Sequence, residues 1–416
     1  MLNIWPELPL VIMTELEKMR RLGVDNIVAA LGQHSRVCHI NLPHSPDSLL
    51  KKIVAMKKPF PALTDLTLSS MDRKAAMVLP DSFLDGSAPR LRKFSLAGIA
   101  FPGLGKLLLS THHLVTLRLW DIPHSGYMSP DAMVTALSAL TRLQRIALTF
   151  RSPRSRAVRE SRLPPPLARV VLPALITLEF QGDSEYFEDF VSRIDAPLHH
   201  IYITFFNQLV FDTPLLLRHF ISRTKTFQAS QAHWSANVVF RPKYAEVSFF
   251  GQEARPDGKI RKLCLRISCE PFDWQLSWLV QVCSSLPPVP TFEYLDIRIL
   301  EDEYPPERQR RRQEQRQDDT ESTQWLELCN AFTSVRCLRL SGHLVPLIVP
   351  ALKELAQVLP ALQNISLWEP QPSGASRKSI EKFVAARMLS GFPVTVHHLE
   401  GEGGWKIHWA YETFID

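Results

Sequence analysis

The sequence has little of what secreted, membrane-spanning or disulfide-stabilised proteins need. Only six of its 416 residues are cysteines, and no two of them form a Cys-x-x-Cys pair. Such scattered thiols are typical of reduced cysteines in an intracellular protein. The first residues lack a basic stretch followed by an apolar run, and no apolar stretch is long enough to span a bilayer. We therefore expect a soluble protein of the cytoplasm or the nucleus, without a membrane partner.

Motifs for catalysis and cofactor binding are also missing. No Ser, Cys or His lies in a nucleophile-elbow, Walker or dinucleotide-binding pattern, and the glycine turn at 401–404 is not followed by a helix that would bind phosphate. Histidines occur as adjacent pairs at 112–113, 199–200 and 397–398, but neighbours on a strand face opposite sides and do not chelate one ion. We expect no enzymatic activity, no metal and no cofactor.

Charge of one sign is not in large excess. The net charge is +6, which does not by itself predict nucleic-acid binding. One basic run, 308–316, is broken by Gln and Glu and flanked by acidic residues, which favours a solvated loop over a nuclear address or a nucleic-acid patch. A second basic segment, 151–169, contains a single glutamate and a Ser-Pro-Arg-Ser-Arg stretch that would suit phosphorylation, although a solvated loop is again favoured. Nucleic acid is not an expected partner.

What the sequence does contain is a short repeated pattern, clearest in Leu114–Asp121, which we call the repeat frame. It consists of an apolar residue, a second one three positions later and a third two positions after that. Apolar residues two apart mark one face of a strand. The frame recurs at Val37/Ile40/Leu42, Leu63/Leu66/Leu68, Leu91/Phe94/Leu96, Leu143/Ile146/Leu148, Leu175/Leu178/Phe180, Leu198/Ile201/Ile203, Ile260/Leu263/Leu265, Phe292/Leu295/Ile297, Val335/Leu338/Leu340 and Leu362/Ile365/Leu367.

Successive frames from Val37 to Leu198 begin 23 to 32 residues apart, a period that predicts a leucine-rich-repeat solenoid. The expected fold is α/β, with a curved, mostly parallel sheet and helical or irregular crossovers. No asparagine ladder accompanies the frames, so the repeats should be irregular. The predicted organisation is an N-terminal helical cap at 1–36, a solenoid at 37–399 with polar insertions near 151–169 and 301–322, and a C-terminal cap at 400–416.

Several local elements are predicted around the frames. An opening strand at 8–13 and a helix through Asp25 and Leu31 precede the first repeat, and helical patterns occupy 46–56, 130–140, 186–194, 214–222 and 379–389. Ser45 and Ser129 each precede a proline, the order expected for a cap at a helix start. Segments 236–240 and 245–250 are predicted to form an added hairpin, and 394–397 a last strand.

Residues between the buried frame positions should point away from the core, onto the concave face of the sheet. They include Trp, Tyr and Arg, the residue types that are enriched in the energetic hot spots of protein interfaces. The candidate binding residues are Arg118, Trp120, Arg145, Glu179, Tyr202, Arg266, Arg298, Arg339 and Trp368. The alternative is that these are scattered exposed side chains without a common role, because such residues occur on many surfaces.

Five further stretches bear on the kind of repeat protein: Lys58–Leu63, Leu79–Leu91, Leu117–Tyr127, Ile203–Leu209 and Phe211–Pro214. They resemble the repeat region of F-box-like proteins expanded in mushroom-forming fungi. The resemblance implies that the repeats capture a protein substrate, and that an N-terminal F-box docks onto the Skp-type adaptor of a cullin ubiquitin ligase. The F-box itself is not recognisable here, so the adaptor is expected as a partner only if a longer form supplies that module. The alternative is a free-standing leucine-rich-repeat scaffold unrelated to ubiquitin.

Overall fold

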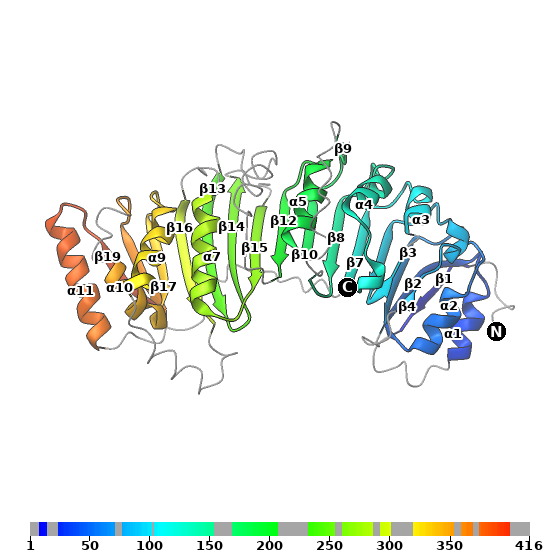
Figure 1. Cartoon of the computed structure of the whole chain (residues 1–416), viewed down its shortest axis with the longest axis horizontal. Coiled ribbons are helices and arrows are strands. Elements are labelled where there is room, and N and C mark those ends of the chain that lie inside the picture. The colour runs from blue at the N-terminus through cyan, green and yellow to red at the C-terminus, as the bar shows by residue number, and fades with distance from the viewer. Residues whose placement is uncertain are drawn as a thin grey trace. The chain divides into compact units, whose positions relative to one another are not determined.

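The structure is a computed structural model that describes residues 8–14, 24–70, 77–101, 104–153, 169–206, 232–253, 260–285, 292–300, 319–352, 359–368 and 374–399. These residues form two compact units, one up to Phe206 and one from Ala232 (Figure 1). We call them unit 1 and unit 2 and describe each by itself. No helix among the described residues is long and apolar enough to cross a bilayer.

Unit 1 is built on a sheet of parallel strands that follow one another in chain order. The strands are β1 (Leu10–Met13), β2 (Val37–Ser45), β3 (Asp65–Ser70), β5 (Lys93–Ala97), β7 (Thr116–Ile122), β8 (Arg145–Phe150), β10 (Thr177–Gly182) and β12 (His200–Phe205). Each is hydrogen-bonded to the preceding one in parallel. Two short parallel pairs lie apart from this sheet: β4 (Met77–Val78) with β6 (Ile99–Ala100), and β9 (Val170–Val171) with β11 (Ile194–Asp195).

The repeat frame sets the register of these strands. The middle residue of each frame lies opposite the middle residue of the next, so that Phe94, Leu117 and Ile146 are consecutive partners. The leading leucines of the frames are equally buried, with Leu91 and Leu114 at 0% exposure. Stacking of equivalent apolar positions between neighbouring strands is the construction of a leucine-rich-repeat solenoid, and the predicted fold class is confirmed.

The crossovers of unit 1 contain short helices that lie over one face of the sheet (Figure 1). They are α1 (Val24–Leu31), α2 (Asp47–Val54), α3 (Leu104–Ser110), α4 (Pro130–Leu137), α5 (Ser184–Ser192) and the 3₁₀ turns η1 (Phe83–Gly86) and η2 (His124–Gly126). Ser129 caps α4 as predicted, because its Oγ accepts a hydrogen bond from the Ala132 N–H at 3.2 Å. The cap predicted at Ser45 is wrong: its hydroxyl donates instead to the Leu42 carbonyl at 3.0 Å, and Pro46 occupies the cap position of α2.

Unit 2 departs from simple chain order. Its strands are β13 (Ala232–Arg241), β14 (Tyr244–Glu253), β15 (Ile260–Ser268), β16 (Phe292–Ile299), β17 (Cys337–Ser341), β18 (Asn364–Trp368) and β19 (Thr395–Leu399), in the spatial order β15-β14-β13-β16-β17-β18-β19. The predicted hairpin is confirmed as β13 and β14, which pair antiparallel, and β14 pairs antiparallel with β15. The remaining pairs, β13 with β16, β16 with β17, β17 with β18 and β18 with β19, are parallel.

Two contacts fix this hairpin. Gly251 on β14 lies opposite the fully buried Trp234, and a Cβ at Gly251 would come within 2.7 Å of the indole ring. Only glycine therefore allows the indole to lie against β14. On the helix side, the buried Gln275 amide donates to the carbonyls of Arg241 at 2.9 Å and Cys269 at 2.6 Å, which ties the hairpin turn to the chain after β15.

The helices of unit 2 are α7 (Phe272–Ser285), α9 (Asp319–Asn330), α10 (Val345–Leu352) and α11 (Gly374–Leu389), with the 3₁₀ turn η6 (Gly342–Leu344) before α10. They lie over one face of its sheet (Figure 1). Because α9 begins at Asp319, the last four residues of the insertion predicted at 301–322 are helical rather than loop. Arg387 of α11 is fully buried and donates to the Leu362 carbonyl at 3.1 Å.

Some predictions fall outside the described residues. These are the helix at 214–222, most of the polar segments within 151–169 and 301–322, and the cap at 400–416. The described part of the region 1–36 consists of the edge strand β1 and the helix α1, which agrees with the predicted opening strand and helix.

The burial of the frame leads to a direct test of stability. Leu117 is fully buried between Phe94 and Ile146, so Leu117→Asp would place an unpaired carboxylate in the apolar core. We expect a loss of about 3–5 kcal/mol in the free energy of unfolding. The control is Thr116→Asp, one residue earlier on the opposite face, where Lys93 and Arg145 are the register partners. A chemical-denaturation midpoint that fell equally in both variants would contradict the assigned core face.

Candidate functional site

The side of each sheet opposite the helices carries the predicted binding residues, and we call it the open face of that unit. All nine candidates alternate with buried frame residues along their strands and lie on this face. Arg145 is exposed and the other eight are half-buried. Five of them belong to unit 1 and four to unit 2, so the structure arranges them as two separate groups.

In unit 1, one row across the open face combines opposite charges with an aromatic ring. Arg118, Ala147, Glu179 and Tyr202 are successive register partners on β7, β8, β10 and β12. Partial burial lowers the pKa of Arg118 from its ordinary value, Glu179 opposes this change, and Arg145 adds to it. Ala147 lies between Arg118 and Glu179, and because it is small, no long side chain separates these two opposite charges along the row.

Trp120 lies two residues after Arg118 on the same strand. The Arg118 guanidinium lies over the Trp120 ring, with its Cζ 5.9 Å from the ring centroid. The strand bulges directly after it: Trp120 and Asp121 together oppose Thr149, and Asp121 adopts a left-handed φ of 50°. The Asp121 N–H donates to Thr149 Oγ1 at 3.0 Å. Bulges of this kind redirect neighbouring side chains, so the position of Trp120 depends on this irregularity.

An ion pair holds the bulge. Arg151 donates to the Asp121 carboxylate from Nε at 3.2 Å and from Nη2 at 3.0 Å. The sequence pattern had placed Arg151 in a solvated basic loop, whereas the structure places it in this ion pair at the end of β8. Arg169, at the other end of the same segment, donates to the Ser192 carbonyl at 3.1 Å.

In unit 2, cationic side chains of the open face lie over aromatic rings. The distances to the ring centroids are 4.3 Å for Arg266 and 5.4 Å for Arg241 over Tyr244, 5.1 Å for Lys262 over Phe250, 5.1 Å for Arg298 over Trp368 and 5.5 Å for Arg339 over Tyr294. A guanidinium is attracted to the negative face of a ring and loses little hydration when it stacks there. The pairs therefore hold long side chains against the sheet.

Two carboxylates are built into the same face. Glu246 is 8% exposed, accepts hydrogen bonds from Arg266 at 2.6 Å and from the Ser248 hydroxyl at 2.8 Å, and lies opposite Arg266 in the register. Burial alone would raise the pKa of Glu246, but the charge and hydrogen bonds of Arg266 outweigh it and hold the pKa below its ordinary value. Asp296 forms a bidentate pair with Arg298, two residues further along β16.

Sequence reasoning missed part of this group. Glu246, Tyr244 and Phe250 lie on β14, which carries no repeat frame, so the pattern gave no register for them. The alternation of Ala245, Val247 and Phe249 as buried residues was the available signal, since it places their neighbours on the other face.

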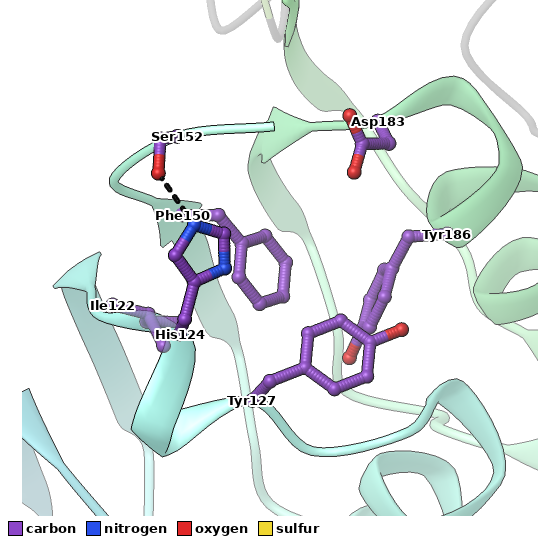
Figure 2. Close-up of a pocket in the computed structure, with 7 residues that line it drawn as sticks. All are labelled: Ile122, His124, Tyr127, Phe150, Ser152, Asp183 and Tyr186. Carbon is purple, nitrogen blue, oxygen red and sulfur yellow. Dashed lines mark hydrogen bonds between the residues drawn. The ribbon is translucent and has the colours of Figure 1, made fainter. Parts of the chain in front are cut away.

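A pocket in unit 1 was also not predicted (Figure 2). It lies where β7, β8 and β10 end and is lined by Ile122, His124, Tyr127, Phe150, Ser152, Asp183 and Tyr186. His124 Nε2 and the Ser152 hydroxyl are 2.9 Å apart, the spacing of a nucleophile and its base. However, no described carboxylate bonds to the other ring nitrogen of His124. The rings of Tyr127, Phe150 and Tyr186 pack together in the wall, with the Phe150 and Tyr186 ring centroids 4.7 Å apart. Among the described residues, the pair therefore lacks the third group that orients a catalytic histidine.

The cysteines and histidines do not assemble into a metal or redox site in the described residues. All six cysteines are free thiols, and no three or more His, Cys, Asp or Glu side chains in the described ranges are grouped for an ion. Burial raises the pKa of Cys264 and of Cys329 to about 12, and that of Cys269 to about 11. These thiols are protonated at neutral pH and therefore weak nucleophiles.

Comparison with known proteins adds little. No protein-family model and no curated protein sequence matches the chain. Among solved structures, the chain is similar to the leucine-rich repeat-containing protein LegL7 from Legionella pneumophila, with 14% sequence identity over 83% of this chain and 95% of that chain and a TM-score of 0.32. The fold assignment rests on the strand register described above.

The Glu246–Arg266 pair gives a prediction about pH. Glu246→Gln leaves the Arg266 guanidinium without its charged partner, and we expect the free energy of unfolding to fall by about 1–3 kcal/mol at pH 7. A carboxyl whose pKa is lower in the folded state contributes stability above its unfolded pKa and loses it as the pH falls through the folded value. The difference in the free energy of unfolding between wild type and variant should thus narrow below about pH 4.5, the ordinary pKa of a glutamate.

Denaturant unfolding at several pH values from 7 down to about 3 would measure this difference in the free energy of unfolding, because the difference narrows only below the ordinary glutamate value. Glu327→Gln, on the exposed surface of α9, is the matched control and should leave stability nearly unchanged. A difference that stayed constant over the whole range would show that the Glu246 carboxylate is not held by Arg266.

Proposed function

We propose that the chain is a non-catalytic repeat module that binds another protein through its open faces, and that it acts as a substrate receptor of the F-box type. The observation that carries the binding role is the layer of arginine–ring pairs on these faces. Arginine and aromatic residues dominate interface hot spots, and here their side chains are already ordered against the sheet. A solenoid of repeats also favours binding, because it spreads such residues over an extended surface.

The ubiquitin-ligase role rests on the resemblance of stretches such as Leu79–Leu91 and Leu117–Tyr127 to fungal F-box-like proteins. The alternative is a leucine-rich-repeat scaffold with no connection to ubiquitin, and the free cysteines fit either role in the cytoplasm or the nucleus. The Ser152–His124 pair does not favour an enzyme, since it lacks an orienting carboxylate among the described residues.

The adaptor provides the test of the receptor role. If the proposal is correct, a purified Skp-type adaptor should co-elute in gel filtration with the chain, or with a longer form of it that supplies an F-box. A receptor with a known F-box serves as the positive control. Separate elution of the adaptor from a folded chain and from any longer form would leave the scaffold as the better description.

The open face of unit 1 is tested by Arg118→Ala combined with Trp120→Ala. Both side chains lie outside the core, so the fold should persist, while the affinity for a protein partner should fall by about 2 kcal/mol or more if either residue is a hot spot. The comparison variant lacks residues 154–168, where charge would dominate binding and affinity would weaken as salt rises. Full affinity in the double variant, with loss in the deletion, would move the site from the sheet to that segment.

A further inference from the structure

One arginine on the open face of unit 2 differs from its neighbours. Arg266 and Arg298 each hold a carboxylate of the same face, Glu246 and Asp296. Arg339 lies on β17 in register with Asp296, whose two oxygens both accept from Arg298. Within the described ranges Arg339 contacts the Tyr294 ring but pairs with no carboxylate. Of the three arginines Arg266, Arg298 and Arg339, two are thus paired with a carboxylate of this face and the third is not.

Hydrogen-bond donors near this position also lack acceptors. The Arg339 Nε–H and the Trp368 Nε1–H are both buried, and neither has an acceptor in the described part of the chain. Trp368 lies on the adjacent strand β18, two residues beyond Ser366, the register partner of Arg339. Unpaired indole and guanidinium N–H groups also occur elsewhere in the described residues, for example at Trp120 and Trp325, so the observation that points to an acceptor from outside is the guanidinium charge of Arg339, which has no carboxylate partner there.

We propose that the open face of unit 2 binds an acidic segment of a partner protein, with an Asp or Glu carboxylate of that segment paired to Arg339. The inference rests on the protein-binding function proposed above and specifies its ligand. Carboxylates are the anions that this face already holds, since the half-buried Arg266 and Arg298 pair with the buried Glu246 and Asp296. A planar guanidinium binds a carboxylate through two parallel hydrogen bonds, which gives direction as well as charge.

A protein segment fits this face better than a nucleic acid. A phosphate backbone places a negative charge at each nucleotide, whereas only Arg339 of these three arginines has no carboxylate partner among the described residues, and its register partner Asp296 would repel a second negative charge beside it. A peptide needs only one or two acidic side chains, and its apolar groups can lie against the exposed Tyr294 and half-buried Trp368 rings. The expected ligand is therefore acidic at one position and otherwise mixed.

Selection from a displayed library of random 12-residue peptides on the full chain would test the proposal. Peptides retained by wild type should share an Asp or Glu at one position, and Arg339→Gln should weaken their binding about tenfold or more. Arg339→Lys should restore only part of it, because an ammonium lacks the planar fork. Arg336→Gln, which removes an exposed charge just before β17, is the matched control and should bind normally.

Cys337 provides a second measurement in the wild-type chain. It is half-buried on β17, two residues before Arg339 on the same face, and lies opposite Tyr294. A selected acidic peptide should slow its alkylation by iodoacetamide, while half-buried Cys38 in unit 1 reacts at an unchanged rate. This readout does not depend on whether the Arg339 variants fold.

The outcomes separate the inference from the function beneath it. Peptides that bind without a shared acid, or that bind Arg339→Gln as well as wild type, would overturn the acidic ligand and leave protein binding intact. If the library yields no binder and no partner protein is found, both proposals fail. Binding of a single-stranded DNA oligonucleotide that is lost in Arg339→Gln would replace the peptide with a nucleic acid.

Discussion

The structure depends on the stacking of equivalent apolar side chains between neighbouring strands. A single repeat contributes only the three apolar residues of its frame, which are too few to form a core. When Leu117 lies between Phe94 and Ile146, each strand completes the core of the next. The same alternation fixes the opposite face, since a one-residue slip would exchange the buried and open sides. Register, core and open face are thus set by one constraint.

This constraint explains how much of the molecule could be predicted. The frame residues gave the parallel strands and their buried side, and hence the placement of Arg118 and Trp120 on the open face, because period-two patterning determines orientation. The frame did not predict contacts that depend on one particular neighbouring side chain. Ser45 bonds to Leu42 instead of capping α2, and Arg151 pairs with Asp121, 30 residues earlier in the chain.

The open face of unit 2 was only partly predictable for a related reason. Arg266, Arg298 and Arg339 follow from the frames, but Glu246, the carboxylate partner of Arg266, lies on the inserted hairpin, where no frame assigns a register. Pairing, burial and ring stacking are properties of the assembled sheet. Ordered side chains lose less conformational entropy on binding than mobile ones, so the stacked arginines form a surface that is organised before a ligand arrives.

The inserted hairpin makes the two units differ in how they can be built and altered. In unit 1 each strand pairs with the strand just before it, so repeats can be added in order during synthesis, and a whole repeat could be duplicated or lost during evolution without changing the topology. In unit 2 the partner of β16 is β13, and β14 and β15 are made between them. One edge of β13 therefore stays unpaired until β16 has been synthesised. The β13–β16 pairing joins segments that lie further apart in the chain than the neighbouring strands of unit 1 do, and such non-local pairings form more slowly in general.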